Sequence, residues 1–512
     1  MADENEAAGL PMAPKWDPER LQAEVNELEA LAQQPAIPRA LGYIKRTGPG
    51  LLQSAMTLGA GSAAASVVAG ASFGYKLLWI QPVAMFLGVC MMAALSNVVL
   101  TTGERPYRAF GQRTNMFLVF LWALGTVMAS IIWHFPQYGL AAGAARDLAD
   151  LASIECRVAE GEVDSTWMKL GYTSTGLIVS FLMGGFILAI NTITTWSYGS
   201  GSRGIKLYEW FLRGVIALII LAFGIVVFAN FGNIDWTEMG KGFIGWYGIP
   251  EGSTTLVLGM LGAAVGINMT FLYPYSLLAK GWGPAHKPLA RWDLGMTMFL
   301  PFVMVTSFVI LAMTVSGVYD PTIEGVRTGM KPLDAAASLQ GVMGETAGRI
   351  IFDLGLVSMA CGAISAHMVV CGFTICEMFG LKHTAWRFKL FALAPAIGFF
   401  GVVTNLPIWF PIAASAVCFT MLPIAYILFL LMNNKRSYIG DAVGKGFGRI
   451  VFNAILVIAL TVATVGAAIK IKGNVIDKLF GSQANSGPAY NPNPTKQPDE
   501  TPAEPSPEEP AG

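Results

Sequence analysis

The sequence predicts an all-α polytopic membrane protein, and two observations carry that prediction. The 512 residues are 54% hydrophobic and only 13% charged, whereas a soluble globular protein has about 25% charged residues. The chain also contains eleven apolar runs of roughly the 20 residues that a helix needs to cross a bilayer. A soluble protein with so little charge could not cover its own surface, so the soluble classes are excluded.

The predicted spans differ in strength. Several are rich in Gly, Ala, Ser and Thr, which allow close helix packing in lipid. The ninth is the weakest, because it is short and contains Pro395. Residues 1–48 contain no apolar segment typical of a signal peptide. The predicted spans are 49–73, 77–100, 115–143, 174–195, 207–231, 254–279, 292–317, 349–376, 388–404, 407–432 and 447–470.

Lys and Arg are concentrated in alternate loops. If the N-terminus is cytoplasmic, the inside segments hold 17 Lys and Arg residues and the longer outside loops hold 8. The excess of positive charge in cytoplasmic loops therefore predicts a cytoplasmic N-terminus. The lack of an organellar targeting segment favours a bacterial inner membrane.

The remaining composition excludes several other classes. Lys+Arg and Asp+Glu balance at 33 each, so no basic excess indicates a nucleic-acid partner. Six cysteines show no CxxC pairing, which argues against a disulfide scaffold or a zinc ribbon. Neither a Gly-rich phosphate loop nor a hydrolase motif is present. We expect no enzyme activity and no cofactor; the expected partners are the lipid bilayer and a transported substrate.

The two ends of the chain are not expected to span the membrane. Residues 17–33 predict a short amphipathic helix within a cytoplasmic segment 1–48, with Asp17 as N-cap and Pro18 in the first turn. Residues 471–512 form a Pro/Glu-rich tail that is predicted to be disordered. The transporter domain is expected at 49–470, with repeat one at 49–231, repeat two at 254–432 and an extra helix at 447–470.

The first and sixth spans are interrupted at corresponding places. GAGS (59–62) interrupts the first span, and GIN (266–268) interrupts the sixth. These spans begin the two five-span halves of the chain. Paired interruptions are typical of inverted-repeat transporters that bind substrate near the bilayer midplane. Unwound backbone is tolerated in lipid only where it lines a cavity, so we expect a binding site between these two spans.

Three segments carry a family resemblance. GPGLLQSAMTLGAGS (48–62), followed by YKLLW (75–79), resembles the first helix of the natural resistance-associated macrophage protein (NRAMP) divalent-metal transporters and the turn after it. LYPYSLL (272–278) is similar to part of the family's sixth helix, and MLPIAYILFLLMNN (421–434) to its tenth. The resemblance runs from about 40 to 470. It implies a LeuT-type fold, proton-coupled import of Mn²⁺ or Fe²⁺, and a metal site between helices one and six.

The resemblance also implies which residues form the site, although most of the family's metal-binding side chains are replaced in this chain. The aspartate and asparagine of its DPGN motif fall on Gly59 and Ser62, and its site methionine falls on Asn268. The family's acidic pair for proton passage falls near His134 and Gln137. The implied metal ligands are Ser62 and Asn268, and the implied substrate-binding residues are Gly59, Ser62, Val265, Asn268, Thr270 and Ser415.

These residues predict which cation the site prefers. A dehydrated divalent cation inside a membrane needs anionic ligands, and transition metals also gain from sulfur or imidazole. The implied residues offer only neutral hydroxyl, amide and carbonyl groups. Mg²⁺ keeps several of its waters, so Mg²⁺ is predicted ahead of Mn²⁺ or Fe²⁺. A branch of the family that imports Mg²⁺ also replaces the methionine, but it keeps the acid that is missing here.

Two histidines lie deep in predicted spans, where ionisable groups are often functional. For His134 a proton-relay role and a structural role are both open, whereas His367 is interpreted as a structural donor. Most of the 24 methionines are interpreted as packing residues, and Met56, Met260 and Met421 as sulfur ligands only if the alignment is shifted.

Two alternatives to a metal transporter stay open. A repurposed family member could carry a non-metal solute, or an anion held at the positive N-terminal ends of the broken helices. A sensor or scaffold could keep the fold without transporting anything, although extensions of 48 and about 40 residues are small for a signalling domain.

Overall fold

The structure is a computed structural model of the whole chain, and it is all-helical where it is described. It describes residues 18–156, 173–198, 202–323, 325–327, 330, 344–403 and 409–472. The N-terminal half consists of α2 Pro18–Ala32, α3 Ala36–Ile44, α4 Pro49–Thr57, α5 Ala60–Phe73, α6 Ile80–Thr102, α7 Pro106–Arg113, α8 Met116–Leu151, α9 Ser174–Tyr198, α10 Ser202–Ala229 and α11 Trp236–Phe243. The C-terminal half consists of α12 Thr254–Ala264, α13 Ile267–Ala279, α14 Lys287–Asp293, α15 Leu300–Val315, α17 Glu345–Met378, α18 Ala385–Phe391, η6 Ala394–Val403, α19 Trp409–Phe419, α20 Leu422–Asn434, α21 Arg436–Ile439 and α22 Gly446–Ile471.

Most of the predicted spans are present as apolar helices. Within the described residues, eight helices are long and apolar enough to cross a membrane, and two bent helix pairs raise the number to ten. The fifth predicted span, 207–231, lies in α10, whose described apolar part, Ile216–Ala229, is shorter than a full span. The count of eleven therefore stays a prediction.

Both predicted interruptions are confirmed as breaks between half-helices. The pair α4 and α5 is bent by 48°, and Gly59 between them has an extended backbone with φ −90° and ψ −174°. Between α12 and α13, Val265 and Gly266 are also extended, with ψ of 111° and 159°. Each break therefore leaves one helix C-terminus and one helix N-terminus near the middle of the bundle. The pair α19 and α20 is bent by 41°, which the sequence analysis did not predict.

The ninth span, the weakest in the sequence, is irregular in the structure. It consists of α18 followed by η6, a 3₁₀-helix that begins beside Pro395. A 3₁₀-helix rises about 2.0 Å per residue, against about 1.5 Å in an α-helix, so η6 reaches further than its length suggests. A Cβ at Gly398 or Gly401 would overlap His134 or the Phe135 carbonyl of α8. These two glycines therefore let η6 pack directly against the backbone that carries His134.

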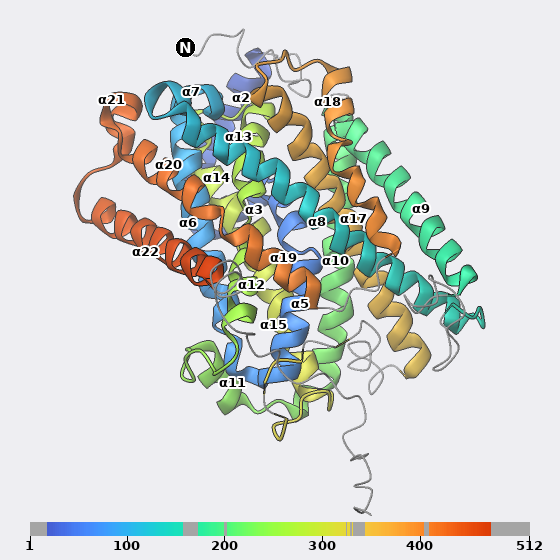
Figure 1. Cartoon of the computed structure of the whole chain (residues 1–512). Helices are drawn as coiled ribbons and strands as arrows, with labels where there is room; N and C mark the ends of the chain where they lie inside the picture. Colours follow the sequence, from blue (N-terminus) through green and yellow to red (C-terminus); the bar gives the residue numbers. More distant parts are fainter. Residues whose placement is uncertain are drawn as a thin grey trace, which may run out of the picture.

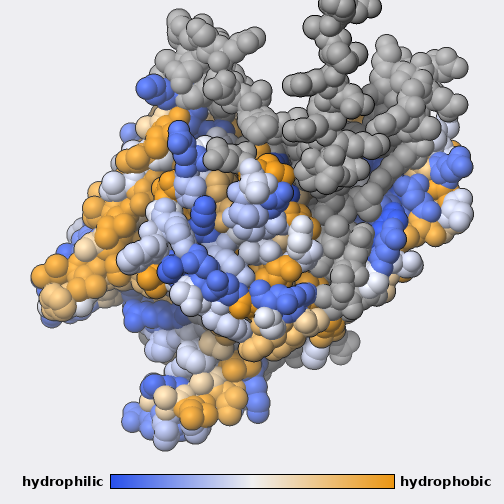
Figure 2. Space-filling view, turned by 90° about the horizontal axis from the view of Figure 1, so that it is seen from below, coloured by the Kyte–Doolittle hydropathy of each residue, from blue (hydrophilic) through white to orange (hydrophobic). Residues whose placement is uncertain are grey.

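The ends of the helix bundle are polar and its flanks are apolar. Figure 1 shows α2, α7, α18 and α21 at the end where the N-terminus lies, and α11 at the opposite end. Seen from that opposite end, hydrophilic residues gather towards the middle, and a broad hydrophobic flank lies on the side where Figure 1 shows α22 (Figure 2). The helices α2, α7, α18 and α21, which lie in segments predicted to be cytoplasmic, thus share one end of the molecule. This is required if the protein has one orientation in the membrane.

The outward faces of the outer helices are apolar. On α9, Ile178, Leu182 and Phe186 follow one another at every fourth residue and are 58 to 69% exposed. On α22, Phe447 and Ile450 are also exposed. Exposed apolar stripes of this kind are stable against lipid and not against water. The surface therefore has the character of a multi-pass membrane protein.

The amphipathic N-terminal helix is confirmed as α2. Leu28 is buried, and Val25 and Leu31 are half-buried on the same face. The proposed N-cap Asp17 and the predicted disordered tail beyond residue 472 lie outside the described residues.

Candidate functional site

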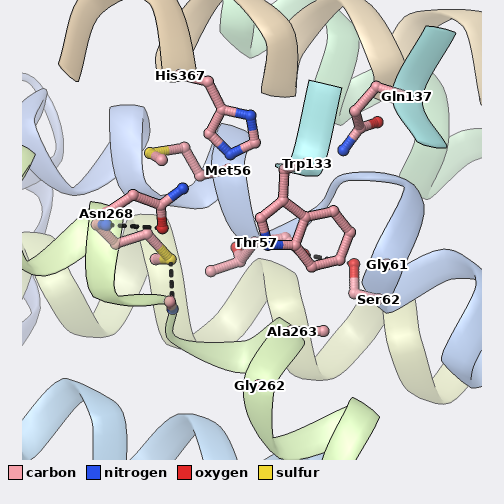
Figure 3. Close-up of a pocket in the computed structure, with 12 residues that line it drawn as sticks. Met56, Thr57, Gly61, Ser62, Trp133, Gln137, Gly262, Ala263, Asn268 and His367 are labelled. Carbon is pink, nitrogen blue, oxygen red and sulfur yellow. Dashed lines mark hydrogen bonds between the residues drawn. The ribbon is translucent and has the colours of Figure 1, made fainter. Parts of the chain in front are cut away.

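A small cavity lies between the two helix breaks (Figure 3). Its volume is about 20 Å³, and a cavity of about 10–15 Å³ is enough for one water molecule. It is lined by Met56, Thr57, Gly61, Ser62, Trp133, Gln137, Gly262, Ala263, Gly266, Asn268, Met269 and His367. The cavity thus lies where the paired interruptions predicted a binding site.

Four half-helices and two long helices form its walls. Met56 and Thr57 close the last turn of α4, and Gly61 and Ser62 begin α5. Gly262 and Ala263 lie at the end of α12, and Asn268 begins α13. Helix N-termini carry partial positive charge and C-termini partial negative charge. Because both kinds of end meet here, the backbone alone selects neither cations nor anions.

Ser62 is a cavity residue whose hydroxyl hydrogen is already used. Its side chain is buried, and Oγ is placed to donate to the carbonyl oxygen of Thr57 or of Gly59, the latter at 3.1 Å. The bond to Thr57 ties α5 to the end of α4 across the break. The oxygen keeps its lone pairs, so Ser62 can still accept a hydrogen bond or contact a cation.

Asn268 is also at the cavity, but its oxygen is engaged. Oδ1 accepts the backbone N–H of Met269 at 3.0 Å, and the amide nitrogen is on the side of the cavity where His367 lies (Figure 3). The Met269 sulfur accepts the N–H of Gly266 at 3.2 Å, which fixes the start of α13. Oδ1 keeps a second lone pair, with which Asn268 can still contact a cation.

Four of the residues implied by the resemblance do not line the cavity. Thr270 Oγ1 accepts from Trp122 Nε1 at 2.9 Å and donates to the Ile267 carbonyl, so it fastens α13 to α8. Val265 packs against Gly88 of α6, and Gly59 lies beside Gln137 Nε2. The Ser415 hydroxyl is buried without a hydrogen-bond partner among the described residues.

Of the two residues implied for proton passage, only Gln137 lines the cavity. His134 lies behind it, with Nδ1 2.8 Å from the carbonyl oxygen of Ser130. The ring of His134 is 5.4 Å from the ring of His367, centroid to centroid. The structure therefore places two histidines, one on α8 and one on α17, side by side next to the cavity.

Three donor residues at the cavity were not expected from the sequence. Met56, Met269 and His367 all line the cavity, although Met56 was interpreted as packing and His367 as a structural donor. His367 is 3% exposed, and its Nδ1 has no hydrogen-bond partner among the described residues. For the two methionines, the place in the sequence could have indicated this role, because Met56 and Met269 each lie within three residues of a helix break. Within the described part of the chain, no group of three or more His, Cys, Asp or Glu side chains could hold a metal ion.

Comparison with known proteins identifies one family model that matches most of the chain. The family model for natural resistance-associated macrophage protein-like (Nramp) proteins matches residues 50–469. This range contains both breaks and every residue of the cavity.

Solved structures with the same fold are transporters. A mutant of the Eremococcus coleocola manganese transporter is 17% identical with a TM-score of 0.58, over 88% of this chain and 89% of that chain. The same transporter in complex with an aromatic bis-isothiourea substituted compound is 16% identical with a TM-score of 0.59, over 88% and 90%. MHP1, a nucleobase-cation-symport-1 family transporter, is 13% identical with a TM-score of 0.53, over 85% and 93%. The LeuT-type fold is thereby confirmed, and at these identities the likeness extends to the fold alone.

Proposed function

The chain belongs to the Nramp family, and from that premise we propose that it is a secondary transporter of divalent metal cations. One observation carries the proposal: a buried polar cavity lies where two broken helices meet. Broken helices around a midplane site are the arrangement by which such transporters bind an ion from either side of the membrane. Family membership also makes the chain a multi-pass membrane transporter and not an enzyme.

The proposed orientation and membrane follow from the sequence. The N-terminus is cytoplasmic, and the cell membrane of a bacterium is the proposed location. Residues 1–48 form the cytoplasmic segment and 49–470 the transporter domain, with the two repeats at 49–231 and 254–432.

We propose that the cation binds between Ser62 and Asn268. Ser62 offers a hydroxyl oxygen, Asn268 an amide oxygen, and the extended backbone at Gly59 and Val265 offers carbonyl oxygens. The Eremococcus coleocola relative is described as a manganese transporter, and Mn²⁺ is one cargo to test.

The finer proposal is that Mg²⁺ is preferred to Mn²⁺. None of the twelve cavity residues carries a carboxylate, so a dehydrated divalent cation would find no charge to offset its desolvation. Mg²⁺ can bind through waters that it keeps. A cavity of about 20 Å³ is too small for that hydrated ion, so its entry requires the half-helices to move apart.

Asp293 marks where such a movement would start. Its carboxylate accepts the N–H of Gly48 at 3.1 Å and of Gly50 at 2.6 Å, which satisfies two free donors at the N-terminus of α4. Asp293 therefore holds the first half-helix in place from the opposite repeat. A movement of α4 away from Asp293 would break these two hydrogen bonds.

Replacing Asn268 by aspartate is expected to tighten binding of Mg²⁺ and Mn²⁺ about tenfold or more. A carboxylate can accept the Met269 N–H as the amide does and still direct a charged oxygen into the cavity. Tenfold corresponds to about 1.4 kcal/mol, a modest gain for a new buried charge pair. Isothermal titration calorimetry on the purified protein measures the effect.

The matched control is Asn191→Asp on α9. Asn191 is fully buried and donates to the Ile187 carbonyl at 2.8 Å, but it does not line the cavity. Its substitution should leave divalent binding unchanged. If N268D binds no divalent ion, or if N191D tightens binding equally, the proposed cation site is wrong.

A further inference from the structure

One side of the cavity offers sulfur and imidazole instead of oxygen. Met56 ends α4, Met269 begins α13, and His367 comes from α17. Figure 3 shows Met56, Asn268 and His367 together on one side of the cavity, away from Ser62 and Gln137. Three elements that are far apart in the sequence therefore present two thioethers and one imidazole to the same small space.

His367 is positioned as a ligand and not as a packing residue. Its side chain is 97% buried and its ring is directed into the cavity (Figure 3). Nδ1 has no hydrogen-bond partner among the described residues. A buried polar atom without a partner is costly, and a ligand bound to the imidazole would reduce that cost. The ring of His134, 5.4 Å away between centroids, does not line the cavity, whereas His367 does.

The character of these donors indicates the cation. Thioethers are soft ligands that select Cu⁺ among the biological metals, and imidazole also suits copper. All twelve cavity residues are uncharged when His367 is neutral. Where no opposite charge is present, removing the water from a monovalent cation costs less free energy than removing it from a divalent cation. We propose that Met56, Met269 and His367 form a binding site for a soft monovalent cation of the Cu⁺ and Ag⁺ class.

The size of the cavity agrees with this assignment. At about 20 Å³ it admits a bare ion or about one water, and a soft cation gives up its water readily to sulfur and nitrogen. The Met269 sulfur already accepts the Gly266 N–H, and a thioether has a second lone pair for a metal. This site goes beyond divalent transport, because it can be filled in the present conformation without movement of the half-helices.

Ag⁺ is the probe, because it has the same charge and softness as Cu⁺ and does not change oxidation state. The purified full-length protein is labelled with ¹³C in the methionine methyl groups and titrated with Ag⁺ while NMR spectra are recorded. The Met56 and Met269 methyl resonances, assigned with M56L and M269L, should shift together and saturate at one Ag⁺. The resonance of Met313, which is buried in α15 outside the cavity, should not move.

His367→Ala should weaken this Ag⁺ binding at least tenfold, and the matched variant Met313→Leu should not change it. His367→Gln serves as a second variant if the alanine variant does not fold. The six free cysteines also bind Ag⁺, but none of them lines the cavity, so a joint shift of both methionine resonances that saturates at one Ag⁺ distinguishes this site from theirs. Ag⁺ binding that leaves both resonances unmoved, or an affinity unchanged by either His367 variant, overturns the proposal. Because no transport is measured, its failure is distinct from a failure of divalent transport.

Discussion

Replacing Gly61 by valine is expected to abolish metal influx. Gly61 is in the first turn of α5 and lines the cavity. A Cβ at this position would overlap the ring of Trp133 and lie 2.8 Å from Ser415 Oγ. Trp133 lines the same cavity, so the added side chain has to displace it or fill the space itself. Overpacking of this kind costs about 1–3 kcal/mol, which corresponds to roughly 5- to 150-fold in an equilibrium constant before the loss of cavity volume is counted.

Influx of Mg²⁺ and Mn²⁺ into proteoliposomes measures the effect of G61V, and we expect a reduction of roughly 100-fold. Gly185→Val is the matched control, because a Cβ at Gly185 on α9 meets nothing within 4 Å. Both variants have to elute as single species in size-exclusion chromatography. A well-folded G61V protein that retains full influx would show that the ion does not pass through this cavity.

Replacing Arg349 by alanine is expected to be the most destabilising single change at the end of the bundle opposite the N-terminus. Arg349 of α17 donates to Asp147 of α8 through two parallel bonds, Nε to Oδ2 at 3.0 Å and Nη2 to Oδ1 at 2.6 Å. The Asp147 side chain is only 3% exposed. Removing one partner of a buried ion pair typically costs about 3–5 kcal/mol, because the buried carboxylate of Asp147 then loses its two hydrogen bonds from the guanidinium.

Thermal unfolding in detergent measures this effect as a fall in apparent Tm. The double variant Asp147→Asn, Arg349→Gln should recover part of the loss, because the side chain at 147 is then neutral and no longer needs the guanidinium as a partner. The control is Arg436→Ala, since the Arg436–Asp441 pair is 75% and 78% exposed and exposed pairs contribute about 0–1 kcal/mol. Equal changes in Tm for R349A and R436A would contradict the account.

The positions of the helix breaks could be predicted from the sequence because they depend on local chemistry. GAGS at 59–62 and GIN at 266–268 cannot continue an apolar helix smoothly, and the two segments stand at matching places in the two halves. The bend between α19 and α20 has no such local signature. The 3₁₀ geometry of η6 also depends on its contact with α8 through Gly398 and Gly401, which no local pattern shows.

The cavity residues were predicted in part for the same reason. Ser62 and Asn268 follow directly from the breaks, and the structure places both at the cavity. His367 could not be predicted, because the central part of α17 is buried on nearly all sides. Such a helix has no amphipathic stripe to show which face meets the cavity. Thr270 does not line the cavity as expected, because its side chain contacts Trp122 on another face of α13.

The central claim is that the chain carries divalent cations through this cavity. Its most direct test is influx of Mg²⁺ and Mn²⁺ into proteoliposomes containing the purified protein, with internal pH followed in parallel. We expect uptake of both ions, with Mg²⁺ ahead of Mn²⁺ because none of the cavity residues carries a carboxylate. The internal pH shows whether a proton moves with the ion, and His367 and His134 are the groups beside the cavity that could relay it. No uptake of either ion would contradict the claim that the chain carries divalent cations, and would mean that the fold transports a different substrate.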